Sequence, residues 1–265
     1  MEELEHIRCY LLDMDGTFYL GDRLLPGALD FLNLLNANRL EYLFVTNNSS
    51  KHARQYGQKL RALGCEVPDE RIFTSGEATR IYLHEHHQGK KVHVLGTPAL
   101  EEEFRGSGIE LTEEDADVLV LGFDTGLTYE KLSKFCNLVR QGKPYIATHP
   151  DLNCPTENGF IPDTGSFIAL IEASTGRRPD VIIGKPFSHI INAITSKTGF
   201  PVAQIAMLGD RLYTDIALGN CGITTILVLC GETKREDLLV SKFKPDFVIE
   251  NLAELTNQLI KQKSG

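Results

Sequence analysis

The sequence predicts an α/β fold, in which parallel sheets are covered by helices on both faces. Short apolar runs alternate with amphipathic stretches almost from end to end, as is typical of that class. Apolar runs near both ends of the chain finish in acidic residues, whereas those of a middle block, from about residue 76 to 180, do not. No repeat or low-complexity linker separates the blocks, so a second domain is expected to be an insertion with short hinges.

The first block begins with an apolar run that ends in an acidic turn. Pro26 then opens a helix whose leucines recur at helical spacing. Ser49 or Ser50 can cap a second helix, which is expected to stop at Gly64 because glycine suits the end of a helix. The strands of this block are expected at residues 7–12, 41–46 and 72–74.

The middle and last blocks continue the same alternation. In the middle block we expect helices at residues 77–87, 128–140 and 165–175, and strands at 91–95, 117–121 and 144–147. In the last block we expect strands at residues 180–183, 203–208 and 223–229, and helices at 188–198 and 252–261. Helices between strands provide the crossover connections that parallel pairing needs.

Composition excludes several classes of protein. The 265 residues are 42% hydrophobic and 24% charged, which is ordinary for a soluble protein able to bury its own core. Acidic residues exceed basic ones by 36 to 27 and there is no basic run, so nucleic acid is not an expected partner. The six dispersed cysteines favour a reducing, cytoplasmic location. The acidic N-terminus and the lack of a long apolar window argue against a signal peptide and against a membrane partner.

Two carboxylates, Asp13 and Asp15, stand where the first apolar strand ends. Side chains at the carboxyl ends of parallel strands point into the crevice where open α/β sheets bind ligands. Two acids there repel each other unless a cation lies between them, and Mg²⁺, which prefers oxygen ligands, is the natural occupant. An ordinary Asx-Gly turn formed by Asp15 and Gly16 explains the same residues equally well.

A second group of polar residues follows strand 41–46, where Thr46, Asn47 and Asn48 precede a helix. Hydroxyl and backbone N–H groups at the start of a helix form an anion site. Helix capping without any ligand is the simpler explanation of the group taken alone.

A third group is Gly184-Lys185-Pro186, after strand 180–183. The glycine permits close approach of the backbone, and the lysine can meet a phosphate as a compact charge. The segment is not a P-loop, because Pro179 stands where that motif needs glycine and Pro186 where it needs Ser or Thr. A surface turn is the alternative.

The fourth group is Gly209-Asp210 at the end of strand 203–208, with Asp215 five residues after Asp210. If Asp215 lies in the following helix, one acid can bind a metal while the other holds waters or the lysine. The same acids would also suit the dipole at the start of a helix without any metal.

Taken in order, these four groups resemble the four motifs of the haloacid dehalogenase superfamily of aspartate-nucleophile phosphatases. The middle block is similar to the cap of its NagD-like (class IIA) branch, which includes 4-nitrophenylphosphatase-like, phosphoglycolate and pyridoxal phosphate phosphatases. The resemblance covers nearly the whole chain, and its cap part is carried by residues 121–124, 128–132, 147–151, 155–159 and 163–166.

The resemblance implies a Rossmann-like, doubly wound parallel core made of residues 1–78 and 182–265. An α/β cap of the C2 type, residues 79–181, would be inserted into it, with the active site between the two. A homodimer formed through the cap is a further expectation from the family.

The resemblance also implies a Mg²⁺-dependent phosphomonoesterase. Asp13 would be the nucleophile that forms an aspartyl phosphate, and Asp15 would protonate the leaving oxygen and then activate water. Asp13, the backbone carbonyl of Asp15 and Asp210 would hold the Mg²⁺ ion, with Asp215 behind them.

The phosphoryl oxygens that do not react would be held by Thr46, the Asn47 backbone N–H and Lys185. Asn48 joins Asn47 as a candidate substrate-binding residue. In the cap, Asp151 and Asn153 lie in what resembles a loop that faces the substrate.

Two residues depart from the family's pattern. Tyr213 stands in the fourth motif where many relatives carry an acid, and this is expected to alter neighbouring contacts more than metal binding. His149 stands where relatives often carry asparagine, close to the candidate substrate loop. The substrate is therefore not transferable from a named relative, and a sugar phosphate, a nucleoside monophosphate or a similar small metabolite is expected.

Two other functions fit the same residues. A phosphotransferase or mutase would use the same aspartyl-phosphate intermediate, and a noncatalytic phosphate-binding protein could keep the same fold. A cap that covers the site favours hydrolysis of a small substrate, and the complete set of candidate catalytic residues speaks against a noncatalytic protein.

Two further groups of residues are interpreted as structural. His84, His86 and His87 are expected at a solvated helix end. Cys221 and Cys230 lie among small or apolar residues and are expected to fill space in the core.

Overall fold

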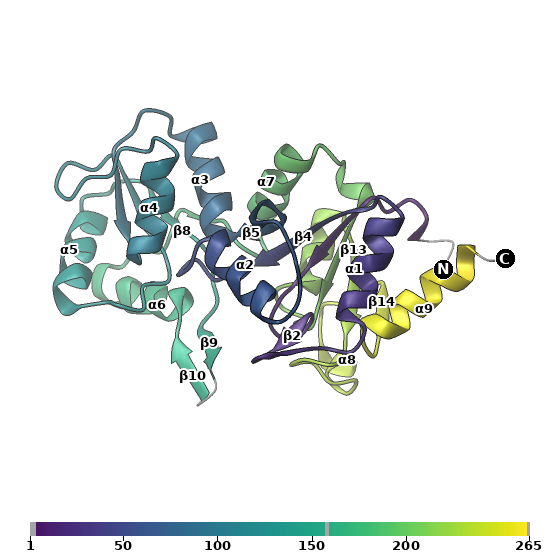
Figure 1. Ribbon diagram of the computed structural model, residues 1–265. Coiled ribbons are helices and arrows are strands. Elements are labelled where there is room, and N and C mark those ends of the chain that lie inside the picture. Colours follow the sequence, from purple (N-terminus) through teal and green to yellow (C-terminus); the bar gives the residue numbers. More distant parts are fainter. Residues whose placement is uncertain (1–3, 157–158, 264–265) are drawn as a thin grey trace. The chain divides into compact units, whose positions relative to one another are not determined.

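The computed structural model describes residues 4–156 and 159–263 (Figure 1). Glu157 and Asn158, from one of the segments similar to the family's cap, lie outside the described residues, as do the first three residues of the acidic N-terminus. The chain divides into two compact units. Unit 1 contains Met1–Thr46, Gly57–Phe73 and Ile194–Gly265, and unit 2 contains Asn47–Tyr56 and Thr74–Ala193. The domain limits expected from the sequence stay a prediction.

Unit 1 is built on a six-stranded sheet with the order β14-β13-β12-β1-β4-β5. Its strands are β1 (Cys9–Leu12), β4 (Glu41–Thr46), β5 (Ile72–Thr74), β12 (Ile205–Gly209), β13 (Thr224–Val228) and β14 (Phe247–Ile249). The central strand β1 is buried along its whole length and pairs in parallel with β12 and β4. Leu12 lies opposite both Leu208 and Phe44, so the carboxyl ends of β1, β12 and β4 meet at one edge.

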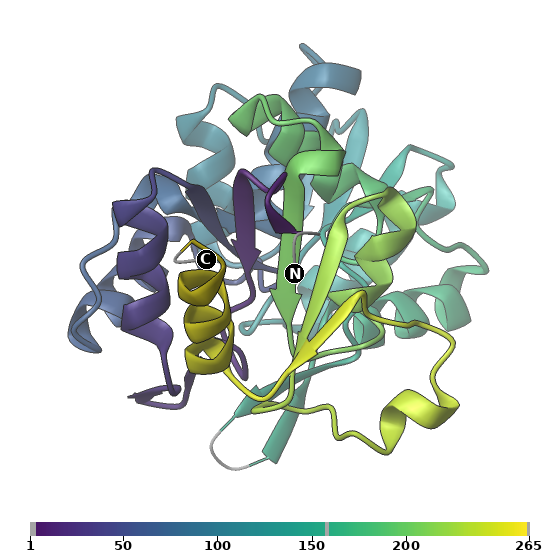
Figure 2. The ribbon, with the colours of Figure 1, turned by 90° about the vertical axis from the view of Figure 1, so that its right-hand side faces the viewer.

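Helices and short elements complete unit 1. Figure 2 shows α1 (Ala28–Ala37) and α9 (Leu252–Lys263) side by side, and the Phe31 ring of α1 packs edge-on against Tyr10 of β1 at 5.7 Å. The remaining elements are the hairpin of β2 (Tyr19–Leu20) and β3 (Arg23–Leu24), the helix α8 (Asp237–Val240), and the 3₁₀ turns Asp69–Arg71, Val202–Gln204 and Ile216–Cys221. Helices α2 (Ala53–Ala62) and α7 (Ser188–Thr198) contribute residues to both units.

Unit 2 is built on a four-stranded parallel sheet with the order β11-β8-β7-β6. Its strands are β6 (Val92–Leu95), β7 (Val118–Leu121), β8 (Tyr145–Ala147) and β11 (Val181–Ile182). Its helices are α3 (Ser75–His86), α4 (Pro98–Gly106), α5 (Tyr129–Arg140) and α6 (Thr164–Thr175), and an antiparallel hairpin joins β9 (Asn153–Thr156) to β10 (Gly159–Pro162). Two parallel sheets with helices confirm the predicted α/β class.

Two predictions about helix starts are wrong. Helix α1 begins at Ala28 with Gly27 as its cap, and the carbonyl of Pro26 instead accepts a hydrogen bond from Ala253 at 3.2 Å. Helix α2 begins at Ala53, too late for Ser49 or Ser50 to cap it. Both serines are instead buried, and their hydroxyl groups form hydrogen bonds with other residues of unit 2.

Phe135 offers a test of the packing in unit 2. Its side chain is fully buried in the core and packs edge-on against Tyr145 at 5.4 Å. We expect Phe135→Ala to lower the free energy of unfolding of unit 2 by about 3–5 kcal/mol, because it leaves a cavity. Urea titration followed by hydrogen exchange of unit 2 peptides measures this. Tyr129→Ala, at a side chain 84% exposed on the same helix, is the control, and equal losses in both variants would contradict this packing.

Candidate active site

An acidic cluster lies at the carboxyl ends of β1 and β12. The backbone N–H of Asp13 donates to the carbonyl of Leu208 at 2.9 Å, which continues the pairing of the two strands. Asp13, Asp210 and Asp215 each offer a carboxylate oxygen, and these oxygens lie within 4.8 Å of one another. Two of the acids expected to bind the metal, Asp13 and Asp210, therefore lie together with Asp215, which was expected behind them.

Asp210 is buried, and its carboxylate is only partly satisfied by hydrogen bonds from the described residues. Its Oδ2 accepts the backbone N–H of Glu232 at 2.7 Å, whereas its buried Oδ1 has no hydrogen-bond partner among the described residues. Burial, and then the charges of Asp13 and Asp215, raise the pKa of Asp210 to about 8. A cation would satisfy the orphaned oxygen and relieve the repulsion, so the donor set fits a hard metal ion with oxygen ligands.

Glycines allow the backbone to approach these acids closely. Gly16 has a φ of +88°, and a Cβ placed on it would lie 2.3 Å from Asp210 Oδ2. A Cβ on Gly231 would lie 2.0 Å from the same oxygen, and one on Gly209 would lie 2.2 Å from the Cβ of Asp215. Gly16 is thus required for two reasons, the positive φ of the turn and the closeness of Asp210. The sequence alone could not distinguish these two reasons.

Asp215 and Tyr213 hold the segment that follows β12. Asp215 is fully buried, and its Oδ2 accepts the backbone N–H of Arg211 at 3.2 Å. Tyr213 donates through its hydroxyl to Glu232 Oε1 at 2.8 Å, while Arg211 pairs with Glu232 Oε2 at 3.0 Å. The unusual Tyr213 therefore contacts the residue whose backbone N–H binds Asp210.

The Asp15 side chain lies beside two residues that the sequence did not single out. Tyr19 donates through its hydroxyl to Asp15 Oδ2 at 3.3 Å, and the Lys59 ammonium lies 3.9 Å from Oδ1 and 4.0 Å from the centre of the Tyr19 ring. Desolvation raises the pKa of Asp15, against the opposing effect of Lys59, although half of the side chain is exposed. A carboxyl group with a raised pKa suits proton transfer.

In unit 2, the side chain of Asn47 brings Lys185 and Asp151 together. Asn47 Oδ1 accepts the backbone N–H of Lys185 at 2.8 Å, and its Nδ2 donates to the Lys185 carbonyl at 2.9 Å and to Asp151 Oδ1 at 2.9 Å. Lys185 is 2% exposed. Thr46, the last residue of β4, belongs to unit 1.

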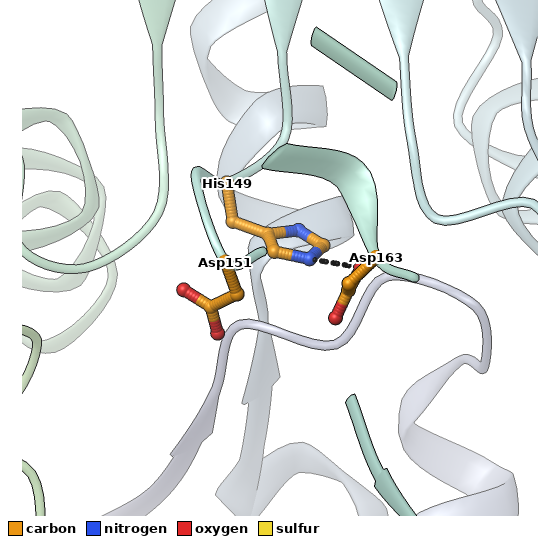
Figure 3. A group of neighbouring side chains, drawn as sticks. All are labelled: His149, Asp151 and Asp163. Atoms are coloured by element: carbon orange, nitrogen blue, oxygen red, sulfur yellow. Dashed lines mark hydrogen bonds and ion pairs between the residues drawn. The ribbon is translucent and has the colours of Figure 1, made fainter. Parts of the chain in front are cut away.

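His149 forms a buried pair with Asp163 (Figure 3). The His149 Nε2 and Asp163 Oδ1 atoms are 2.9 Å apart, and Asp151 lies on the same loop as His149. Burial opposes the charge on His149, but the carboxylate of Asp163 and then that of Asp151 hold the pKa of His149 above its usual value. Asp163 had no role predicted from the sequence, although the departure from the family's pattern at His149 was a signal that a residue of this loop has an unusual partner.

The other sequence-predicted residues are placed as follows. Asn48 Nδ2 lies 3.7 Å from the Cys154 sulfur, and Asn153 is exposed at the start of β9. Their contacts with a substrate stay a prediction. His84 and His86 are exposed in the last turn of α3, which confirms the solvated helix end for these two, whereas His87, the residue that caps the helix, is half-buried.

The two cysteines expected in the core, Cys221 and Cys230, are half-buried. Burial raises the pKa of Cys230 to about 11, which makes its thiol a poor nucleophile. Within the described parts of the chain, no helix has the length and apolar character needed to cross a membrane.

Comparisons with known proteins match nearly the whole chain. A haloacid dehalogenase-like hydrolase profile matches residues 10–110, and a HAD-hydrolase-like profile matches residues 182–255. The acid sugar phosphatase of Staphylococcus epidermidis is 36% identical over 251 residues, which are 94% of this chain and 96% of that protein. The 5′-nucleotidase YutF of Bacillus subtilis is 37% identical over 246 residues, which are 92% of this chain and 96% of that protein.

Solved structures give the same result. The 4-nitrophenylphosphatase of Thermotoga maritima superposes with a TM-score of 0.93 at 52% identity, covering 96% of this chain and 98% of its own. NagD of E. coli K-12 superposes with a TM-score of 0.87 at 31% identity, covering 94% and 98%. These similarities confirm the resemblance carried by the four motifs. The chain therefore belongs to the haloacid dehalogenase-like hydrolases, in their NagD-like branch, and it is a phosphatase.

Proposed function

We propose that this phosphatase hydrolyses a small phosphorylated metabolite with the help of Mg²⁺ and through an aspartyl-phosphate intermediate. The observation that carries the proposal is the acidic cluster at the ends of β1 and β12. It sets Asp13 beside a buried Asp210 whose Oδ1 has no partner among the described residues. This donor set suits a divalent cation, and a carboxylate next to such a cation is well placed to attack phosphorus.

In the proposed first step, an oxygen of Asp13 attacks phosphorus and the bond from phosphorus to the ester oxygen breaks. Asp15 gives its proton to that oxygen, which leaves as an alcohol. In the second step, Asp15 takes a proton from a water molecule, whose oxygen attacks phosphorus and releases inorganic phosphate and the Asp13 carboxylate. Bound Mg²⁺ would supply the charge that lets two anions approach, with Asp13, the Asp15 carbonyl and Asp210 as its ligands.

The phosphoryl oxygens that do not react are assigned to Thr46, the Asn47 backbone N–H and the Lys185 ammonium. Donors fixed before the reaction stabilise the charge that develops on these oxygens. Asp215 takes no part in the chemistry in this proposal and supports the segment that carries Asp210, through its bond to Arg211.

Divalent metal is expected to be indispensable. Chelation should abolish turnover, Mg²⁺ should restore it, and Ca²⁺ should inhibit because it prefers more ligands at about 2.3–2.6 Å. Asp210→Asn should lower kcat/KM by more than about 100-fold, since even residues behind metal ligands cost about 10- to 100-fold. Calorimetric titration with Mg²⁺ reports binding independently of activity. Glu102→Gln, on an exposed part of α4, is the control, and full activity in excess chelator would contradict the metal's role.

The substrate is assigned to the class of small phosphate monoesters, because the relatives are named for a sugar phosphate, a nucleotide and an aryl phosphate. Asp151 and the exposed Asn153 are the candidate residues that select it. The test is a panel of sugar phosphates, nucleoside monophosphates, phosphoglycolate and pyridoxal phosphate, ranked by kcat/KM. Asn153→Ala should reorder the ranking, whereas an unchanged order would remove this loop from substrate selection.

A cytoplasmic location and a homodimer through the cap complete the proposal. All six cysteines are free thiols, as suits a reducing compartment. In unit 2 the hairpin β9–β10 exposes Phe160, 74% of whose surface is accessible, next to Ile161. Exposed apolar side chains of this kind suit a contact between copies. Sedimentation should give twice the chain mass of 29.5 kDa, and a monomer at micromolar concentration would refute the dimer.

A further inference from the structure

We infer that Asn47 is a positioning residue, which fixes the backbone of Lys185 through its side-chain amide and couples it to the carboxylate of Asp151. The inference rests on the proposed function, in which the Lys185 ammonium binds phosphoryl oxygens. It assigns the Asn47 side chain a task other than contact with substrate, and it extends the task to the pair formed by His149 and Asp163.

The Asn47 amide is fully engaged. It is 5% exposed, its Oδ1 accepts from the Lys185 N–H at 2.8 Å, and its two N–H groups donate to the Lys185 carbonyl and to Asp151 Oδ1, both at 2.9 Å. In an antiparallel pair of strands, one residue binds both the backbone N–H and the backbone carbonyl of the residue opposite. Strand β11 ends at Ile182, and at Lys185 the Asn47 side chain binds the backbone N–H and carbonyl as a strand neighbour would.

Because Gly184 has no side chain, the Asn47 amide can lie close to the backbone next to Lys185. A Cβ at this position would lie 2.6 Å from Asn47 Oδ1, 2.8 Å from the His149 Cβ and 2.8 Å from the Thr148 carbonyl. The Gly184 N–H also donates to the Thr148 carbonyl at 2.8 Å. A glycine is therefore required before Lys185 by the Asn47 amide and by the loop that carries Thr148 and His149.

The loop that carries Asp151 is itself held at several points. His149 is fully buried and bound to Asp163, which also caps α6 by accepting the Thr164 N–H at 2.6 Å. The Asp151 carbonyl accepts the Gly165 N–H at 2.8 Å. Figure 3 shows how this pair lies beside Asp151.

Ser75 closes the network. Its hydroxyl donates to the backbone carbonyl of Asn47, and its Oγ lies 3.4 Å from His149 Nδ1. Asn47 is thus held through its backbone by Ser75 and through its side chain by Asp151, while His149 lies beside that serine. The group could be mistaken for a metal site, because ligand atoms of His149, Asp151 and Asp163 lie within 4.8 Å. Hydrogen bonds already engage His149 Nε2, Asp163 Oδ1 and Asp151 Oδ1, so we assign the group to positioning.

A double-mutant cycle tests whether Asn47 acts through Lys185. Asn47→Ala should lower kcat/KM by about 100-fold, the order of loss that a displacement of about 1 Å causes. It should raise the inhibition constant of inorganic phosphate as well. In a Lys185→Met background the same change should cost less than about 3-fold, because the ammonium that it positions is gone. A purely structural role would instead give equal losses in both backgrounds, and equal losses overturn the inference.

A second pair of variants keeps the test valid if Asn47→Ala does not fold. Asn47→Asp keeps the acceptor for the Lys185 N–H but sets a carboxylate against Asp151, so affinity for inorganic phosphate should fall. Adding Asp151→Asn restores a donor to the new carboxylate and should recover part of that affinity. Absence of any recovery in a folded double variant counts against the coupling to Asp151.

The Lys185→Met variant separates this inference from the proposed function. If Lys185→Met leaves turnover and phosphate binding intact, the assigned role of Lys185 fails, and the proposed function fails with it. If Lys185→Met impairs both while folded Asn47 variants bind phosphate as the parent does, only the positioning role of Asn47 fails.

Discussion

Asp13→Asn is expected to abolish turnover and formation of the phosphoenzyme together. An amide is a poor nucleophile and a weaker metal ligand than a carboxylate, so kcat should fall by about 10⁴-fold or more. The strand should persist, because Asp13 pairs with Leu208 through its backbone N–H, which the substitution keeps. Acid quenching after mixing with labelled phosphate ester, followed by counting of protein-bound label, measures the intermediate directly.

The control for this experiment is Asp22→Asn, which removes a carboxylate from the exposed turn between β2 and β3 and should leave labelling unchanged. Peptide mapping locates the label in the parent protein. Label on any residue other than Asp13, or undiminished label in Asp13→Asn, would falsify the proposed mechanism. A phosphotransferase would also label Asp13, but it would pass the group to an added alcohol rather than to water.

Much of the fold could be predicted because apolar periodicity is a local signal. Strand β4 and helix α7 begin and end where the pattern places them. Helix α4 also carried a local signal, a Thr97 cap followed by Pro98, but it was not among the predicted helices. Strands β9 and β10 carried no such local signal. Nearly all of their side chains are exposed, so apolar and polar residues do not alternate along them.

The acidic cluster and the contacts of Asn47 also differ in how far a local signal in the sequence could predict them. Asp13 and Asp210 could be predicted as neighbours, since parallel strands bring their carboxyl ends to one edge and Leu12 is in register with Leu208. The partners of Asn47, in contrast, stand 104 and 138 positions along the chain. Such bonds leave no periodic trace in a sequence.

Capping by the serines after β4 failed for this reason. Ser49 Oγ accepts the backbone N–H of Phe123 at 2.9 Å and lies 2.9 Å from Thr148 Oγ1. The Ser50 hydroxyl donates to Asn48 Oδ1 at 2.7 Å. A serine before a helix predicts a cap only when no buried partner competes for its hydroxyl.

Asp15→Asn is expected to slow the first chemical step strongly for alkyl phosphates and weakly for 4-nitrophenyl phosphate. Proton transfer contributes about 10²- to 10⁴-fold, and an alkoxide needs the proton far more than a nitrophenolate does. The amide has the same shape and can still accept the hydrogen bond that Tyr19 donates to Asp15 at 3.3 Å. The loss therefore reports the missing proton rather than a displaced side chain.

The measurement has to isolate phosphorylation of Asp13 from hydrolysis of the intermediate. Asp15 is also assigned to activate water, and that second step is common to all substrates, so steady-state kcat would conceal the difference. Rapid-quench single turnovers of 4-nitrophenyl phosphate and of a sugar phosphate separate the steps. We expect phosphorylation by Asp15→Asn to fall by about 100-fold or more on the sugar phosphate and by less than about 10-fold on the aryl ester. An equal fall on both would show that Asp15 does not act as the acid, because a group that gives no proton cannot distinguish a good leaving group from a poor one.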